Sequence, residues 1–197
     1  MFVSKIFHFS IGRFFECFQL YRNDMIECDY HETISEANGF RFFMPTAEHL
    51  PLFEKLYEGS PDKIEVIKKR YSSGNYLCFA YQDEITDRIA YARWLCKNNF
   101  YSEPMRRELS FNNDEALTLD SYTHPDYRFK GLHKKNNILM LKWIKDNTSI
   151  GHVYMVIGCF IPHLSKIPLE LGYRPTNRKF NYKKGSFSIF IKHLVRS

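Results

Sequence analysis

Hydrophobic and polar positions follow two different periods along this chain, and the two periods predict a mixed α/β fold. Runs with a period of two are typical of strands, and runs in which apolar residues recur every three or four positions are typical of helices. Strands are expected at residues 39–45, 75–81, 88–96, 115–123, 152–160, 178–182 and 186–193. Helices are expected at residues 46–58, 60–73 and 132–147, with a further short helix before Gly172.

The boundaries of the expected helices carry residues that suit helix ends. Thr46 can cap the first of them, and Pro61 falls in the first turn of the second, where its missing N–H costs nothing. Gly59 and Gly74 follow the last periodic residues of these two helices. These signals indicate two consecutive helices between the strands at 39–45 and 75–81.

The first 38 residues are treated as an N-terminal extension, and residues 39–197 as a single domain. In the extension, apolar residues alternate over 7–11 and again over 14–20, with Gly12 between them, which predicts an added hairpin. A dimerisation or substrate-lid element is the alternative for this extension. Residues 97–114 are polar and predict a loop longer than most connections, a kind of loop that is often functional.

The segment from Glu115 to Ile144 combines a strand, a basic turn and a helix. Pro125 ends the strand because it has no N–H for a ladder bond, and helical spacing begins at Leu132. Gly131 stands at the start of the helix, where unpaired N–H groups and the positive end of the helix dipole favour an anion. Four basic residues surround this turn: Arg128, Lys130, Lys134 and Lys135. The segment therefore predicts a binding site for a phosphate-bearing ligand, most simply a diphosphate.

The spacing Arg-x-x-Gly-x-His at 128–133, with Thr-x-Pro before it and an amphipathic helix after it, resembles the R/Q-x-x-G-x-G/A motif of the GNAT superfamily of acyl-CoA N-acyltransferases. The resemblance implies that backbone amides of this loop hold the pyrophosphate of coenzyme A. Residues expected to bind the cofactor are Thr123, Arg128, Phe129, Lys130, Gly131, Leu132 and His133. The sequence departs from the motif at His133, where the family has Gly or Ala, and at Phe129, where Gly is frequent.

The resemblance also implies an architecture. It is a GNAT-like α/β (α+β) fold with a mixed, mostly antiparallel central sheet, two splayed parallel central strands and flanking helices, plus the N-terminal hairpin. The central strands would be residues 115–123 and 152–160, and the pantetheine arm of the cofactor would lie between them. Leu169-Glu-Leu-Gly-Tyr173 is similar to the family's sequence after its last helix. Two consecutive helices after the first strand would form one wall of the acceptor site, and the polar loop at 97–114 would line or cover it.

Acyl transfer from a thioester to an amine requires a base for the amine and a proton donor for the departing thiolate. Strict alternation along the central strand places Glu115, Leu117 and Leu119 on one face, and Asp120 and Tyr122 on the other. The position that one branch of the family uses for the base falls on Leu117, which cannot ionise. Glu115 is therefore the first candidate base and Asp120 the second.

Tyr122 and Tyr154, on the two central strands, are candidate proton donors. Alignment on Gly172 places Pro168 where the family often has its general-acid Tyr, and Ile161 where it often has Asn. Each candidate also has a structural interpretation: solvation for Glu115, an ion pair with Lys or Arg for Asp120, and core packing for the tyrosines.

The net charge of +6 and the pI near 9.0 favour negatively charged partners, among which are coenzyme A and nucleic acid. Basic residues are spread along the chain, which makes nucleic acid the weaker candidate. Five scattered cysteines without a C-x-x-C pair are typical of a reduced compartment, and no apolar run resembles a secretory signal or a membrane span. We therefore expect a cytoplasmic protein. No spacing typical of metal ligands is present in the sequence.

Together these observations predict an N-acyltransferase, most simply an N-acetyltransferase, that moves an acyl group from acetyl-CoA to a primary amine by direct attack in a ternary complex. The acceptor would be a small-molecule amine or a peptide, without a metal or a membrane, in a monomer or a homodimer. One alternative is a CoA-binding or regulatory module on the same fold that has lost the chemistry. Another is a basic nucleic-acid-binding protein in which aromatic strands stack on bases.

Overall fold

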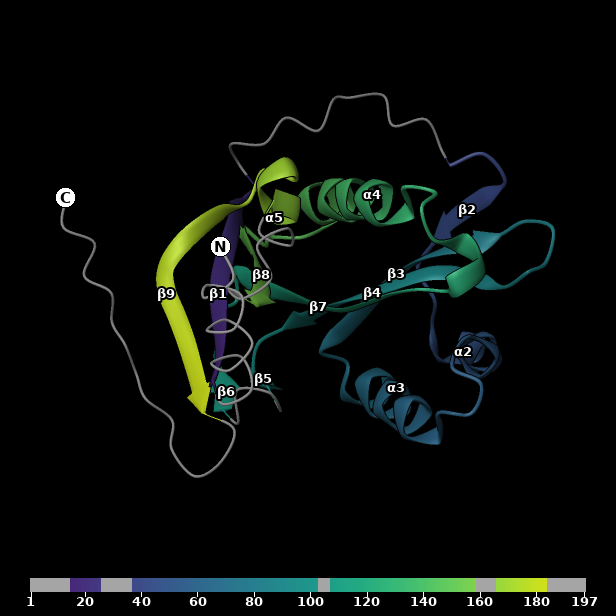
Figure 1. The fold of residues 1–197 in the computed structure, drawn as a ribbon, viewed down its shortest axis with the longest axis horizontal. Coiled ribbons are helices and arrows are strands. Elements are labelled where there is room, and N and C mark those ends of the chain that lie inside the picture. The colour runs from purple at the N-terminus through teal and green to yellow at the C-terminus, as the bar shows by residue number, and fades with distance from the viewer. Residues whose placement is uncertain (1–14, 26–36, 103–106, 159–165, 184–197) are drawn as a thin grey trace, which may run out of the picture.

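In the computed structural model, residues 15–25, 37–102, 107–158 and 166–183 are described. They form a seven-stranded sheet with the order β2-β3-β4-β7-β8-β1-β9 and a separate two-stranded sheet, β5-β6. Helices α4 and α5 cover one face of the large sheet, and α2 and α3 cover the other (Figure 1). The strands are β1 (Phe15–Asp24), β2 (Phe40–Phe43), β3 (Tyr76–Asp83), β4 (Ile89–Lys97), β5 (Phe100–Ser102), β6 (Arg107–Leu109), β7 (Glu115–Thr123), β8 (His152–Gly158) and β9 (Arg174–Lys183). The helices are η1 (Ala47–His49), α2 (Leu50–Leu56), α3 (Pro61–Ser73), η2 (Pro125–Tyr127), α4 (Leu132–Asn147) and α5 (Lys166–Glu170).

This architecture confirms the predicted α/β fold with a mostly antiparallel sheet. Strands β7 and β8 run parallel to each other, as expected for the two central strands. Their pairing extends only from Glu115 opposite His152 to Thr118 opposite Met155. Beyond that point β7 continues to pair with β4, and β8 continues to pair with β1. The two central strands therefore separate after Thr118.

A bulge interrupts β7 at Asp120. The register between β4 and β7 shifts between Ala92 and Trp94, and Asp120 has a left-handed backbone with φ of 43°. As a result Leu119 and Tyr122, three residues apart, pack on the same hydrophobic cluster. The expectation of strict alternation along β7 is therefore wrong beyond Leu119.

The two ends of the described chain meet in the large sheet. Strand β1 lies between β8 and β9 and pairs antiparallel with both, so that Phe18 is opposite Gly158 on one side and Phe180 on the other. The hairpin partners expected at residues 7–11 and 186–193 lie outside the described residues. The loop expected at 97–114 is only partly correct, because β5 and β6 form a short antiparallel pair within it.

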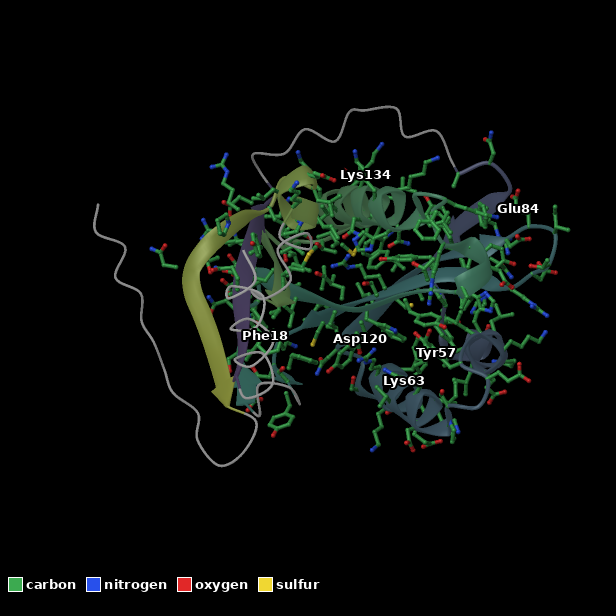
Figure 2. All side chains as sticks on the ribbon, viewed as in Figure 1. Phe18, Tyr57, Lys63, Glu84, Asp120 and Lys134 are labelled. Atoms are coloured by element: carbon green, nitrogen blue, oxygen red, sulfur yellow. The ribbon has the colours of Figure 1, made fainter. Side chains whose placement is uncertain are left out.

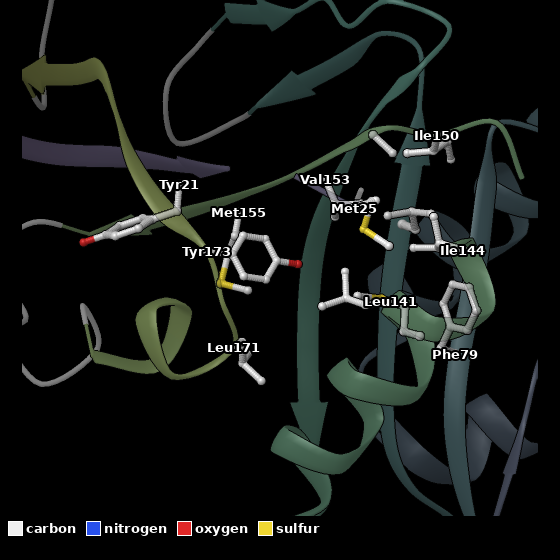
Figure 3. Packing of buried hydrophobic residues seen from close by; sticks show 13 residues of the cluster. Tyr21, Met25, Phe79, Leu141, Ile144, Ile150, Val153, Met155, Leu171 and Tyr173 are labelled. Atoms are coloured by element: carbon white, nitrogen blue, oxygen red, sulfur yellow. The ribbon is translucent and has the colours of Figure 1, made fainter. Parts of the chain in front are cut away.

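The hydrophobic core consists of a layer on each face of the sheet. On the α4 face, Leu141 and Ile144 of the helix pack with Phe79, and Tyr21 and Met25 bring the N-terminal strand into the same cluster (Figure 3). On the opposite face, the layer of aromatic and aliphatic side chains includes Phe53, Leu56, Ile64, Ile67 and Trp94. The sheet is therefore held between two separate groups of helices. None of the helices in the described segments combines the length and the apolar character that crossing a lipid bilayer requires.

Candidate functional site

The basic turn between β7 and α4 exposes backbone N–H groups. The ring of His124 accepts a hydrogen bond from the N–H of Asp126 at 3.3 Å and so caps η2. Gly131, with φ of 71°, is the N-cap of α4, and the first N–H to bond back within the helix is that of Lys135, to the Gly131 carbonyl at 3.2 Å. The N–H groups of residues 132–134 have no acceptor inside the helix. They are available to an anion.

The charges around this turn reinforce its positive potential. The first turn of α4 contains no acidic residue, although carboxylates are favourable at that position. Lys134 is exposed on α4 (Figure 2), and Arg128 is exposed at the entry to the turn. A helix start with basic residues and no acid is unfavourable by itself, and a bound anion would relieve it.

Lys130 is held in place by aromatic rings. Its ammonium lies 5.3 Å from the ring centroid of Phe40 and 5.1 Å from that of Tyr127. These two rings meet edge to face at 5.7 Å, and the Tyr127 hydroxyl is 3.0 Å from the hydroxyl of Thr86. The positive charge of Lys130 is therefore positioned beside the turn by β2 and by the β3–β4 connection.

Phe129 has a fully exposed side chain and a left-handed backbone with φ of 65°. Such a conformation is unfavourable for a residue with a Cβ, which explains why glycine suits this position. Left-handed residues in a turn help successive N–H groups to converge on an anion. The structure thus gives a physical reason for the glycine that is frequent in the motif at this position, and none for the phenylalanine that replaces it here.

His133, the other departure, turns towards the sheet. Its Nδ1 lies 3.1 Å from the hydroxyl of Tyr91, and the two rings are 5.7 Å apart. Burial, with the positive charge of Arg93 nearby, lowers the pKa of His133 to about 4. Leu132 is likewise buried. Of the predicted cofactor residues, Leu132 and His133 therefore offer only their backbone to the turn, whereas Arg128 and Lys130 offer exposed charges and Thr123 ends β7.

Glu115 is hydrogen-bonded to the second central strand. The Tyr154 hydroxyl donates to Glu115 Oε1 at 2.7 Å, and the Asn112 N–H donates to Oε2 at 2.9 Å. Burial and the Glu115 carboxylate raise the pKa of Tyr154 to about 12. The ring of Phe111 lies 5.4 Å from the Tyr154 ring. Tyr154 precedes Met155, the residue at which the β7–β8 pairing ends.

Strand β1 adds further polar side chains next to Glu115 and Tyr154. Arg22 is the cross-strand neighbour of Tyr154, and Asp24 is the neighbour of His152. Asp24 Oδ1 is 2.7 Å from His152 Nδ1 and 2.9 Å from Arg22 Nε. Sequence reasoning missed Arg22, Asp24 and His152. The alternation in β8 places His152 and Tyr154 on one face, but the pairing of β1 with β8 has no local signal in the sequence.

Asp120 and Tyr122 lie towards α2 and α3. Asp120 forms an ion pair with Arg70 of α3, whose guanidinium lies 5.0 Å from the Trp94 ring centroid. Tyr122 packs against Tyr57 with ring centroids 5.0 Å apart (Asp120 and Tyr57 are labelled in Figure 2). Leu119 packs both on this cluster and on the cluster of Tyr154. The bulge therefore brings Tyr122 to the face of the sheet that carries Glu115.

No protein-family model and no curated protein matches the sequence. Solved structures do match the fold. A tandem GNAT protein from the clavulanic acid biosynthesis pathway superposes with a TM-score of 0.62 at 11% identity over 93% of this chain and 59% of that chain. A GCN5-related glucosamine N-acetyltransferase region of a fungal multi-domain beta-N-acetylglucosaminidase gives a TM-score of 0.61 at 12% identity over 91% of this chain and 22% of that chain.

A third match is AAC(6')-Iy in complex with a bisubstrate analogue, CoA-S-monomethyl-acetylneamine, with a TM-score of 0.52 at 13% identity over 71% of this chain and 93% of that chain. The chain spans less than two-thirds of the length of the first two neighbours. With its parallel β7–β8 pair, its antiparallel flanking strands and its helices on both faces, the described part of this protein has the fold of the GNAT acetyltransferases.

Proposed function

We propose that this protein is an N-acyltransferase that transfers an acyl group, acetyl in the simplest case, from coenzyme A to a primary amine. The observation that carries the proposal is the separation of β7 and β8 next to a basic turn with free N–H groups at the start of α4. A diphosphate fits this turn because it compensates the charges of Arg128, Lys130 and Lys134. The acceptor class, a small-molecule amine or a peptide, follows from the same reaction.

Backbone N–H groups of residues 129–133 would bind the diphosphate, and Thr123 at the end of β7 would lie beside the donor's arm. This assignment depends on the backbone and not on the side chains of Leu132 and His133, which are turned into the protein. His133 is therefore compatible with the proposed site although the family has a smaller residue there.

The hydrogen bond between Tyr154 and Glu115 joins a base to an acid. In the proposed mechanism Glu115 accepts the proton of the attacking amine, directly or through water, and the Tyr154 hydroxyl protonates the thiolate as it leaves. A tyrosine whose pKa is about 12 is a weak acid at neutral pH. Transfer to the thiolate therefore occurs together with return of a proton from Glu115 to Tyr154 across their 2.7 Å hydrogen bond. After one turnover both groups regain their starting protonation states.

Asp120 is the second candidate base and Tyr122 the second candidate acid. The ion pair with Arg70 stabilises the Asp120 carboxylate and competes with an incoming amine for it. The ring of Tyr122 packs on Tyr57, so the hydroxyl of Tyr122 is the only part of this side chain that can act as an acid. We assign both residues to the wall of the acceptor site.

A non-catalytic CoA-binding module is the second candidate function. The buried Pro168 of α5 favours it, because it stands where the resemblance places the usual general acid and cannot donate a proton. Release of free thiol from acetyl-CoA with a panel of amines separates the two functions: an enzyme releases thiol in an amine-dependent manner, and a binding module does not. Salt-sensitive binding to random oligonucleotides, without CoA binding, would instead support the nucleic-acid alternative.

Binding of CoA is tested by a matched pair of variants at Gly131. Asn and Asp both tolerate a left-handed backbone, and a Cβ at Gly131 meets no atom within 4 Å. Gly131→Asp places a carboxylate against the diphosphate, and we expect it to weaken CoA binding at least about 1,000-fold by calorimetry. Gly131→Asn should lose no more than about tenfold. Equal affinities for both variants and the wild type would overturn the proposed site.

A further inference from the structure

Arg93, in the middle of β4, is a buried cation that is incompletely bonded. It is 3% exposed, and its Nη2 donates to the Thr118 hydroxyl at 2.8 Å. Its Nε and Nη1 are buried and have no hydrogen-bond partner. Among the ion pairs of the described segments, none involves Arg93.

A guanidinium in this situation is unfavourable. Burial removes its water, and the loss is repaid only when a counter-charge and hydrogen-bond acceptors replace that water. Buried polar groups in folded proteins nearly always have partners, so each exception requires an explanation. The Thr118 hydroxyl on one of the three guanidinium nitrogens and the Tyr91 hydroxyl, with which the guanidinium also interacts, are both neutral and supply no counter-charge. A bound group with a negative charge would supply both the counter-charge and the missing hydrogen-bond acceptors.

The first turns of α4 place further unpaired polar atoms in the layer between the helix and the sheet. Asn136 is completely buried, and both atoms of its amide lack a hydrogen-bond partner. The Nε2 atom of His133 is also buried and unpaired. Tyr91, whose hydroxyl is 3.1 Å from Nδ1 of His133, lies two residues before Arg93 in β4, so its side chain and that of Arg93 share one face of the sheet. Helix α4 contacts β4 directly.

The position of Arg93 relates this polar layer to the central strands. Thr118, which accepts the bond from Arg93, is the last residue of β7 that pairs with β8. Its hydroxyl in turn donates to the backbone carbonyl of Tyr154 at 3.1 Å. The guanidinium therefore lies where β7 and β8 begin to separate, close to the place that the proposed function gives to the thioester.

We propose that Arg93, together with Asn136 and His133, binds a carboxylate at the end of the donor's acyl group, so that the preferred donor is the CoA thioester of a dicarboxylic acid. This inference rests on the proposed function and specifies its donor. A carboxylate compensates the guanidinium charge and accepts hydrogen bonds from its unused N–H groups, whereas a neutral amide carbonyl of the donor's arm would leave the charge uncompensated. The carboxylate itself takes no part in the bond changes of acyl transfer.

Two donors of equal chain length test the inference. Succinyl-CoA carries a terminal carboxylate where butyryl-CoA carries a methyl group. We expect the wild-type protein to bind succinyl-CoA at least about tenfold more tightly than butyryl-CoA in calorimetric titrations. Equal affinities would overturn the inference and leave the proposed function intact, because both thioesters would still bind.

Arg93→Met removes the buried charge and keeps an extended side chain. We expect this variant to lose the preference for succinyl-CoA and to bind butyryl-CoA as the wild type does. Lys142→Met is the matched control, because it removes one positive charge from an exposed position of α4. The preference should persist in the control. Persistence of the preference in Arg93→Met would overturn the inference.

The comparison of donors on the wild-type protein does not depend on any variant, so it decides the question even if Arg93→Met fails to fold. Failure of the wild-type protein to bind CoA or either thioester would overturn the proposed function, and the inference with it. Binding of CoA without discrimination between the two thioesters would overturn the inference alone.

Discussion

The turn at the start of α4 and the polar face formed by β7, β8 and β1 are built in opposite ways. Binding groups of the turn come from consecutive residues and are mostly backbone N–H groups and exposed basic side chains. Side chains of the polar face come from distant parts of the chain: 39 positions separate Glu115 from Tyr154, and 128 separate Asp24 from His152. A local motif can therefore indicate the proposed binding site, whereas the proposed catalytic groups can be identified only after the strands have been placed.

The two regions should also respond differently to substitution. Under the proposed function, long-range charge and the course of the backbone in the turn determine binding, so changes there should affect affinity and stability. On the polar face, short hydrogen bonds such as that of Tyr154 to Glu115 at 2.7 Å hold the proposed proton donor and acceptor in position, so changes there should affect the rate. Substitutions in each region test whether affinity depends on the turn and the rate on the polar face.

Glu115→Gln should have the largest effect on the rate, and it should leave binding of CoA unchanged. The amide cannot accept the proton of the amine, so we expect kcat to fall about 100- to 1,000-fold, or about 3–4 kcal/mol. The turn at 128–133 is unchanged, so the Kd for CoA should stay within about twofold. Steady-state thiol release and calorimetry measure the two quantities.

Asp120→Asn is the matched comparison for this prediction. It neutralises the other carboxylate candidate and weakens the ion pair with Arg70, so we expect a loss in kcat of less than about tenfold. A greater loss for Asp120→Asn than for Glu115→Gln would reverse the assignment and make Asp120 the base.

Much of the fold follows from local signals. Pro125 and Gly131 mark the strand-to-helix transition, and the structure places η2 and the start of α4 at these residues. Gly74, with φ of 68°, ends α3 as expected from its position after the last periodic residue. Proline and glycine act through their own backbone restrictions, so their effects can be deduced without knowledge of distant contacts.

Features that depend on distant pairing could not be deduced in this way. The position of β1 between β8 and β9 rests on hydrogen bonds between strands that are far apart in sequence. The bulge at Asp120 changes the face of the sheet on which Tyr122 lies, and the alternating sequence pattern does not predict this bulge. Arg70 was foreseen only as an unspecified basic partner for Asp120. The contacts of Asp120 and Tyr122 with α2 and α3 therefore required the three-dimensional structure, whereas the turn that we propose to bind a diphosphate did not.

A substitution of His133 tests whether this side chain is buried in the core or faces the turn. Its pKa of about 4 in the folded protein lies below the ordinary value of 6.5, because burial and Arg93 disfavour the charged ring. The unfolded chain then binds more protons between these two pH values, so stability falls as the pH is lowered from about 6.5 to about 4. The loss should reach about 3 kcal/mol at the lower pH.

His133→Gln should remove this loss, because glutamine does not titrate. Urea unfolding at pH 7.0 and pH 4.5 measures the free energy of unfolding for both proteins. We expect the decrease between the two pH values to be smaller by about 2–3 kcal/mol in the variant. Parallel behaviour of the two proteins would show that His133 is not buried as a neutral ring, and that it faces the binding turn.

Phe129→Gly should have the smallest effect, and it isolates the backbone of the turn. The Cβ of Phe129 makes its φ of 65° unfavourable by about 1–2 kcal/mol, and glycine removes this strain. Part of the stabilisation is lost because glycine has greater conformational freedom in the unfolded chain. The exposed ring contributes no burial, so we expect a net stabilisation of up to about 1 kcal/mol in urea unfolding. Phe129→Ala removes the ring but keeps the Cβ, and should therefore leave the stability unchanged. Stabilisation by both variants would attribute the cost to the exposed ring, and weaker CoA binding by both would show that this ring contacts the cofactor.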